Sequence, residues 1–333
     1  MRREIVWALA ALVVVGLGCS RKEMVARTFY PMGGIPFTIK AYNVPESLFD
    51  ETADAIEQET ERLEQVFSVH RADSEVSRLN REGSIQASPD LARVARAALK
   101  IAVESDGAFD VTIGPVLDLW RYSAREKRWP TEDEVRQRMA LVDYNQLHVS
   151  GSDVITLKQK NMSVDFGGIA KGLIVDMAAQ RLKKQGIRRG IVDAGGDLVL
   201  FNSVGEAPFK VGIKHPERPD SRFAIMALDS GAVVTSGCYE RFEIVEDRKV
   251  CHIVDPRTGY PVSELLSVTV VAQEAVTADG LATAVMVLGN ERGQALIRSL
   301  PGVEGVLVWK TGDTLEWWIS PGLQGKVKVE QQQ

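Results

Sequence analysis

The hydrophobic pattern changes near residue 149, and this change constrains the fold more than any other feature. Before it, apolar residues recur at helical spacing over residues 46–66 and 88–105. After it, short runs rich in Val, Ile and Phe dominate, with helices expected near 170–185, 278–288 and 291–299. Because helices and strands are segregated rather than alternating, we expect an α+β fold, with two intimately packed lobes and mixed β-sheets flanked by helices.

Two helix starts are marked by capping residues. Ser88 precedes Pro89, which suits the first turn of a helix. Thr131 stands three residues before Glu134, the spacing of a capping box. These signals predict one helix that runs to about residue 105 and a second, shorter helix after Thr131.

The first 31 residues are expected to lie outside the folded domain. An apolar run from Ile5 to Leu17 has the length of a signal-peptide core and is too short to span a bilayer comfortably. It leads into Cys19, which indicates a lipoprotein signal, although Gly16 stands where such signals usually have leucine. We expect a signal peptide over 1–18, lipidation of Cys19 and a polar tether over 19–31. An uncut N-terminal anchor is the alternative, and both place the chain on the periplasmic or extracytoplasmic face of a membrane.

The rest of the chain has an ordinary globular composition. Of its 333 residues, 45% are hydrophobic and 26% are charged, which excludes a disordered chain and a polytopic membrane protein. Without a repeat or a long linker, residues 32–320 are expected to form a single domain, followed by a flexible tail over 321–333. The net charge of −5, with no block of basic residues, argues against nucleic acid as a partner.

Two cysteines flank an expected hairpin of residues 239–245 and 249–254. In that register Cys251 faces a residue near Phe242 and not Cys238. We therefore expect no disulfide between them, although the compartment would permit one.

A glycine-rich segment, residues 164–172 (VDFGGIAKG), is the first that suggests chemistry. A strand is expected to end at Asp165 and a helix to begin near Ala170. Backbone N–H groups at such a helix start can bind a phosphate, and Lys171 would add positive charge. A tight structural connection is the alternative, and the glycine spacing fits neither a Walker loop nor a dinucleotide-binding fingerprint.

A second segment, residues 277–283 (TADGLAT), places a carboxylate and a hydroxyl together. Asp279 and Thr283 are four residues apart and therefore share one face of a helix. Their oxygen atoms make a half-site suited to Mg²⁺. The alternative is structural, with Asp279 as a helix N-cap and Thr283 simply buried.

A third segment, residues 251–259 (CHIVDPRTG), runs from a strand into a turn. Pro256 keeps the preceding residue extended. His252 and Asp255 are candidates for an acid or a base, although a single histidine on a strand is usually structural. No HExxH, CxxC or Gly-x-Ser-x-Gly pattern occurs, so zinc hydrolases and serine esterases are poorly supported.

Taken together, these segments resemble the ApbE family of FAD:protein FMN transferases, also described as thiamine-biosynthesis lipoproteins. The resemblance extends from about residue 30 to 318, and six blocks occur in the family's order. These blocks are 67–80 (FSVHRADSEVSRLN), 107–115 (GAFDVTIGP), 164–172, 193–197 (DAGGD), 252–259 and 277–283. Each block alone is a modest signal, whereas six in order are highly specific.

The resemblance implies an ApbE-like fold and a transferase of phosphorus-containing groups on the periplasmic side. Such enzymes use FAD as a substrate and Mg²⁺ as a cofactor. They transfer FMN to a threonine of a membrane redox protein and release AMP. Their acceptor motif is Asp-x-x-Ser/Thr-Gly-Ala-Ser/Thr.

The resemblance also assigns expected roles to residues of this chain. The metal ligands would be Asp279, Thr283 and the carbonyl of Ala170, and the candidate base is His252 or Asp255. The positions expected to contact FAD are Met32, His70, Ala108, Phe109, Asp110, Gly167, Gly168, Lys171, His252 and Ile253. His70 departs from the family, in which this position is commonly tyrosine.

Two other functions remain open at this point. An FAD pyrophosphatase would use the same metal site, with water in place of the threonine. A flavin-binding lipoprotein without catalysis would not require Asp279, Thr283 and His252 together, so we consider it less well supported.

Overall fold

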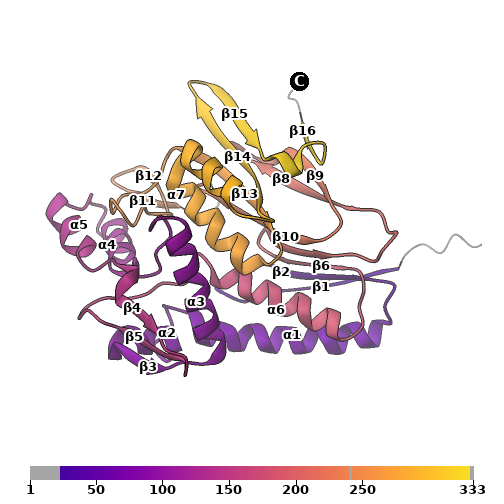
Figure 1. Ribbon diagram of the computed structural model, residues 1–333, viewed down its shortest axis with the longest axis horizontal. Helices are drawn as coiled ribbons and strands as arrows, with labels where there is room; N and C mark the ends of the chain where they lie inside the picture. The colour runs from indigo at the N-terminus through magenta and orange to yellow at the C-terminus, as the bar shows by residue number, and fades with distance from the viewer. Residues whose placement is uncertain (1–22, 240–241, 331–333) are drawn as a thin grey trace, which may run out of the picture.

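The computed structural model describes residues 23–239 and 242–330, and its architecture is α+β (Figure 1). The expected signal peptide and the lipidation site Cys19 lie outside these residues. No helix within the described ranges is both long enough and apolar enough to cross a membrane.

An eight-stranded sheet forms the centre of the molecule, and every neighbouring pair in it is antiparallel. In spatial order its strands are β1 (Met24–Phe29), β2 (Phe37–Tyr42), β6 (Gly190–Ala194), β7 (Asp197–Phe201), β10 (Gly231–Gly237), β13 (Leu265–Ala272), β14 (Glu304–Thr311) and β15 (Thr314–Ile319). All paired strands in the described chain are antiparallel, whereas mixed sheets were expected from the sequence.

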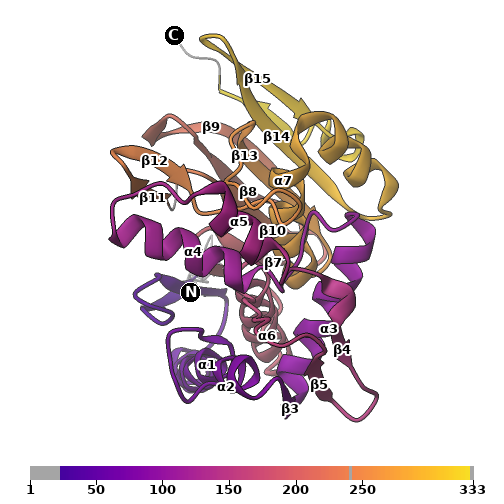
Figure 2. The same ribbon diagram turned by 90° about the vertical axis from the view of Figure 1, so that its left-hand side faces the viewer.

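Helices cover one face of this sheet and a smaller sheet covers part of the other (Figures 1 and 2). The helices of the described chain are α1 (Glu46–Phe67), α2 (Glu75–Glu82), α3 (Pro89–Glu104), α4 (Gly114–Arg125), α5 (Glu132–Met139), α6 (Ala170–Lys184) and α7 (Ala275–Ser299). Of these, α1, α6 and α7 contact the strands of the central sheet. The smaller sheet has the order β16 (Val327–Val329), β9 (Arg218–Leu228) and β8 (Phe209–His215). Helices α6 and α7 pack against each other and against the central strands, so both reach the middle of the molecule.

The remaining elements are short. A three-stranded sheet joins β3 (Ser84–Gln86), β5 (Val154–Leu157) and β4 (Leu147–Val149), and two 3₁₀ turns span Tyr144–Gln146 and Pro321–Leu323. Strands β11 (Phe242–Val245) and β12 (Arg248–Cys251) form a hairpin that packs beside α4 (Figure 2). Buried residues of α4 and of this hairpin share a separate small apolar cluster.

The locally encoded features agree with the sequence. The Ser88 side chain accepts a hydrogen bond from Leu91 N–H, and Thr131 with Glu134 forms a complete capping box. The two helices expected near 278–288 and 291–299 form one element, α7, that is interrupted at Gly289, where φ is 76°. Such a left-handed conformation favours glycine and explains the break in the pattern.

Three boundaries were predicted wrongly. Residues 24–29 of the expected tether form β1 and pair with β2. Part of the expected tail forms β16, which pairs with β9. The strand expected over 163–165 is reduced to one isolated bridge between Ser163 and Ile113. Strand β16 depends on a partner distant in the sequence, so local patterns give no sign of it, whereas β1 pairs with the next strand along the chain.

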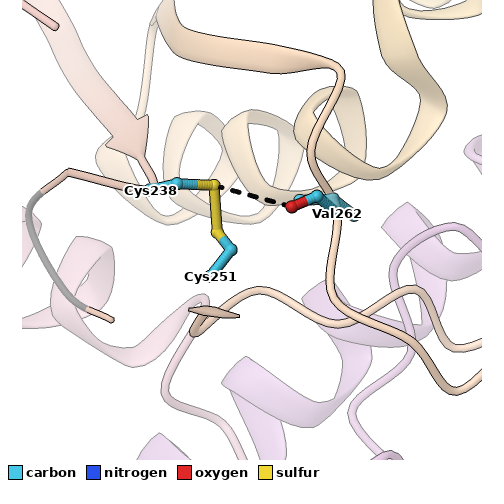
Figure 3. The surroundings of a disulfide bond; sticks show 3 residues. All are labelled: Cys238, Cys251 and Val262. Atoms are coloured by element: carbon cyan, nitrogen blue, oxygen red, sulfur yellow. Dashed lines mark hydrogen bonds between the residues drawn. A yellow bond between two sulfur atoms is a disulfide. The ribbon is translucent and has the colours of Figure 1, made fainter. Parts of the chain in front are cut away.

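The expectation that Cys238 and Cys251 stay unpaired is also wrong, because they form a disulfide with a Cα–Cα distance of 4.9 Å (Figure 3). The predicted register is correct, since Phe242 faces Cys251. Cys238 instead follows the end of β10, outside the hairpin, so the hairpin register does not determine its distance from Cys251. The disulfide ties the end of β10 to the end of β12.

Asp176 joins α6 to the first turn of α7. Its carboxylate oxygens each accept a backbone N–H at 2.9 Å, from Ala275 and from Val276, and the residue is buried. Burial raises the pKa of Asp176 to about 6, although these two hydrogen bonds act in the opposite direction. The side chain therefore satisfies two helix-start donors that would otherwise be buried without a partner.

We expect Asp176→Asn to lower the free energy of unfolding by about 1–3 kcal/mol near pH 5, because the hydroxyl oxygen of the protonated carboxyl can still accept the second N–H, whereas the NH2 group of the amide cannot. A carboxyl group whose pKa is higher in the folded than in the unfolded chain stabilises at low pH and loses that contribution as the pH rises through the folded value. The difference between wild type and variant should therefore narrow as the pH rises from roughly 5 to 7.5. Denaturant unfolding of both proteins at both pH values measures the difference in free energy of unfolding. If this difference does not change with pH, the pKa of Asp176 is not raised in the folded chain.

Candidate active site

A cavity of about 560 Å³ lies where α4, α7, the start of α6 and the end of β12 meet. Its lining residues come from four of the six sequence blocks, and these four blocks are far apart in the chain. Ten of the predicted site residues line it: Ala108, Phe109, Asp110, Gly167, Gly168, Lys171, His252, Ile253, Asp279 and Thr283. Met32, His70, Ala170 and Asp255 are not among the lining residues.

Asp279 and Thr283 lie on α7 and both face the cavity. Asp279 is only 3% exposed, and its Oδ2 accepts the N–H of Gly172 at 3.0 Å. Since α7 begins at Ala275, the alternative in which Asp279 is an N-cap is wrong. The helical spacing thus correctly predicted that the carboxylate and the hydroxyl share a face.

The glycine-rich segment approaches α7 closely at this point. A Cβ atom added to Gly168 would lie 3.2 Å from Thr283 Oγ1 and 3.3 Å from Phe109 Cε2. Any larger residue at position 168 would therefore press on the hydroxyl and on the ring. The close approach brings the backbone next to the carboxylate–hydroxyl pair, with Ala170 two residues further along the chain.

These donors fit a hard divalent cation. A carboxylate, a hydroxyl and a backbone carbonyl are oxygen ligands of the kind that Mg²⁺ binds, usually together with water and substrate phosphates. Across the described ranges there is no group of three or more His, Cys, Asp or Glu side chains arranged to hold a metal. The donor set at Asp279 therefore suits Mg²⁺ and is unlike a zinc site.

Asp165 and Arg121 hold the glycine-rich segment from the other side. Asp165 Oδ1 accepts the N–H of Gly167 at 2.8 Å, and its Oδ2 accepts a hydrogen bond from Arg121 Nη2 at 2.8 Å. Arg121 Nη1 also donates to Asp118 at 3.1 Å. Burial opposes the charge on Arg121, but Asp165 and Asp118 outweigh it, so the pKa of the guanidinium is raised.

The expectation that helix-start amides bind a phosphate is wrong for most of them. The N–H of Gly167 bonds to Asp165, those of Ile169 and Ala170 bond to Phe166 O, and that of Gly172 bonds to Asp279. These four amides hold the segment in place. The positive charge that reaches the cavity here is that of Lys171, whose Nζ lies 2.5 Å from Asp197 Oδ2.

His252 and Asp255 have different surroundings. His252 directly follows β12 and lines the cavity, next to the disulfide-bonded Cys251. The Asp255 carboxylate accepts three hydrogen bonds from Arg257, from N at 2.8 Å, Nε at 2.9 Å and Nη2 at 2.8 Å. Asp255 thus closes the turn, and of the two candidate bases only His252 faces the cavity.

Asp110 also has a structural role. It accepts the N–H and the hydroxyl of Thr112, both at 2.7 Å, and the N–H of Tyr144 at 2.9 Å. Burial raises the pKa of Asp110, partly offset by these hydrogen bonds. The carboxylate therefore shapes the turn that carries Ala108 and Phe109 into the cavity lining.

Two predicted FAD contacts lie outside the cavity lining. Met32 has a left-handed φ of 52°, and its N–H donates to Glu64 Oε2 at 3.0 Å. His70 lines a groove that adjoins the cavity and shares Arg121, Phe242 and Glu243 with it. His70 is therefore next to the cavity mouth and not inside it.

The sequence reasoning missed several residues of the lining. Arg121 and Asp165 are 44 positions apart in the sequence, and their pairing becomes visible only in the structure. Thr235 and Ser236, at the end of β10, also line the cavity, as does Trp120, whose Nε1 donates to Gly259 O at 2.9 Å. The sequence feature that could have predicted α4 is an amphipathic helical pattern just after the 107–115 block, which contains Trp120 and Arg121.

Comparison with known proteins identifies similar chains over nearly the full length. The ApbE family model matches residues 33–307. The FAD:protein FMN transferase of Vibrio cholerae serotype O1 is 32% identical over 324 residues, covering 94% of this chain and 96% of the relative. The sequence resemblance is thus confirmed.

Solved structures agree with this match. The flavin transferase ApbE from Vibrio cholerae has a TM-score of 0.81 and 30% identity, covering 92% of this chain and 99% of that one. The apo form of the Pseudomonas stutzeri flavinyl transferase ApbE has a TM-score of 0.79 and 27% identity, with coverages of 92% and 97%. The expected fold is confirmed by both.

Proposed function

This chain belongs to the ApbE family, and from this membership and its cavity we infer that it is an FAD:protein FMN transferase. The observation that carries the proposal is the meeting of Asp279, Thr283, Lys171 and His252 in one cavity. A site that only bound flavin would not need a metal half-site, a cation and a candidate base together.

We propose that FAD binds with its pyrophosphate near Lys171 and the Asp279–Thr283 pair. Asp279, Thr283 and the Ala170 carbonyl would hold Mg²⁺, which when bound would neutralise charge on the pyrophosphate oxygens. Gly168 leaves room for the close approach of the glycine-rich segment. Arg121 and Asp165 fix that segment through the N–H of Gly167.

The proposed reaction is a phosphoryl-type displacement at the FMN phosphorus. The hydroxyl oxygen of an acceptor threonine forms a bond to this phosphorus, while the bond from phosphorus to the bridging oxygen breaks. AMP leaves with the bridging oxygen, and the hydroxyl proton passes to the His252 imidazole as general base. Asp255 keeps its structural role in the turn and takes no part in proton transfer.

We further propose that the acceptor is a membrane redox protein with the motif Asp-x-x-Ser/Thr-Gly-Ala-Ser/Thr. The enzyme itself would be a lipoprotein, anchored through acylated Cys19 on the extracytoplasmic face. The 13-residue apolar core before Gly18-Cys19 supports this location. Mass spectrometry of the membrane fraction tests it, and a retained Met1 or an unmodified start beyond residue 19 would refute lipidation.

The test of the function uses purified protein, FAD, Mg²⁺ and a peptide that carries the acceptor motif. We expect the peptide to gain the mass of FMN while an equal amount of AMP appears. A peptide with alanine in place of the acceptor threonine is the matched control and should stay unmodified. Release of AMP and free FMN, with no modified peptide, would identify an FAD pyrophosphatase instead.

A further inference from the structure

A second hollow adjoins the cavity and has a different character. This groove, of about 930 Å³, runs between α4 and the β11–β12 hairpin and continues into the cavity mouth through Arg121, Phe242 and Glu243. Figure 2 shows α4 alongside this hairpin. Any chain that delivers a side chain to the cavity from this side must pass along the groove.

The α4 wall of the groove is basic at one end, beyond the paired Arg121 and Asp118. Arg125 and Lys127, at the end of α4 and just after it, are exposed and line it. Neither forms an ion pair with any residue in the described part of the chain. Arg125 instead lies over the ring of Tyr122, 5.9 Å from its centroid. Two cations that the fold does not neutralise favour an acidic partner at this wall.

The opposite wall carries two apolar side chains with Glu243 between them, and it is acidic at its tip. Phe242 and Ile244 alternate along β11, are 44% and 49% exposed, and both line the groove. Val245, between Ile244 and the turn, is buried and anchors the strand. Glu246 and Asp247 occupy the turn, where Glu246 accepts the N–H of Trp129 at 3.1 Å. Large exposed apolar side chains beside a cavity mouth indicate a protein contact.

We propose that this groove docks the acceptor protein as an extended segment, with an acidic side chain against Arg125 and Lys127 and an apolar side chain against Phe242 and Ile244. The proposal rests on the transferase function above, because the docked segment presents its hydroxyl at the cavity mouth. The acidic turn of the hairpin repels the acidic part of the segment and so sets the direction in which the segment lies.

Direct binding of a labelled peptide that carries the acceptor motif, measured by fluorescence anisotropy, tests the docking without turnover. The charge-reversed double variant Arg125→Glu with Lys127→Glu should weaken peptide binding by about tenfold or more at low salt, since attractive pairs become repulsive ones. The loss should shrink as salt is added, because exposed charges are screened. Ile244→Ser should also weaken binding, in a manner that does not depend on salt.

Matched variants elsewhere on the surface provide the controls. Lys158→Glu with Lys160→Glu has the same spacing and the same charge change on exposed residues outside the groove. Val103→Ser removes an exposed apolar side chain from α3. Neither control should change peptide affinity. A peptide with asparagine in place of the motif's aspartate should bind the wild type weakly and be nearly insensitive to the charge reversal.

The outcomes separate docking from function. If the groove variants bind the peptide like the wild type, the docking proposal is overturned, even if the wild type transfers FMN. If they lose FAD affinity instead, measured by flavin fluorescence, the groove holds part of FAD and the proposal is equally overturned. If the groove variants lose peptide affinity but the wild type transfers no FMN, the docking proposal stands and the proposed transferase function fails.

Discussion

Asp279→Ala is expected to abolish flavin transfer, and EDTA is expected to silence the wild-type protein. Asp279 supplies the only carboxylate of the proposed Mg²⁺ half-site, next to Thr283 on the same face of α7. We expect a loss of at least about 100-fold, because even residues that merely orient a metal ligand contribute 10- to 100-fold. Release of AMP and the mass of the modified peptide measure the effect.

A second variant separates chemistry from folding. Asp279 also accepts the N–H of Gly172, so alanine leaves this buried donor without its acceptor and destabilises the chain as well. Asp279→Asn can keep that hydrogen bond while it removes the negative charge, and it should be folded but inactive. Thr283→Ser should retain activity, whereas Thr283→Val should lose it. Full activity after exhaustive dialysis against EDTA would contradict the metal role.

The part of this site that was predictable from the sequence is encoded locally. Asp279 and Thr283 share a face because four residues make about one helical turn, and the structure places both in the cavity. Likewise Ser88 and Thr131 cap their helices through bonds to residues three positions away. In each case the interacting groups lie within one turn, so spacing alone predicts the contact.

The features that were missed depend on how separate segments pack together and not on spacing within one helical turn. Strand β1 looked like a polar tether because it lies at the edge of the sheet and is largely exposed, with only Phe29 buried. The disulfide depends on where the end of β10 lies relative to the hairpin, which the hairpin register does not fix. Arg121 and Asp165 meet only because α4 packs near the glycine-rich segment.

The glycine-rich segment shows how a correct position can accompany an incorrect mechanism. Its two glycines were expected to expose backbone amides to a phosphate. The structure uses Gly168 for close approach to Thr283, while the N–H of Gly167 is occupied by Asp165. The sequence therefore located the segment in the site, but only the hydrogen bonds show what the segment does there.

Gly172→Ala is expected to be among the most damaging single substitutions in this chain. An added Cβ would lie 2.3 Å from Ala275 O and 2.6 Å from Val276 Cα, both backbone atoms of α7. No side chain can rotate away to relieve this contact, so α6 and α7 must separate. We expect the free energy of unfolding to fall by about 3 kcal/mol or more, the upper part of the range for overpacked cores.

The same separation should weaken the metal site. Gly172 N–H donates to Asp279, so a shift of α6 away from α7 lengthens the bond that orients this carboxylate. Mg²⁺ affinity, followed through the Mg²⁺ concentration required for AMP release, should therefore fall together with the denaturation midpoint. Gly151→Ala is the matched control, because a Cβ there meets nothing within 4 Å and φ is not left-handed. If Gly172→Ala unfolds like Gly151→Ala, the close packing of α6 on α7 does not position Asp279.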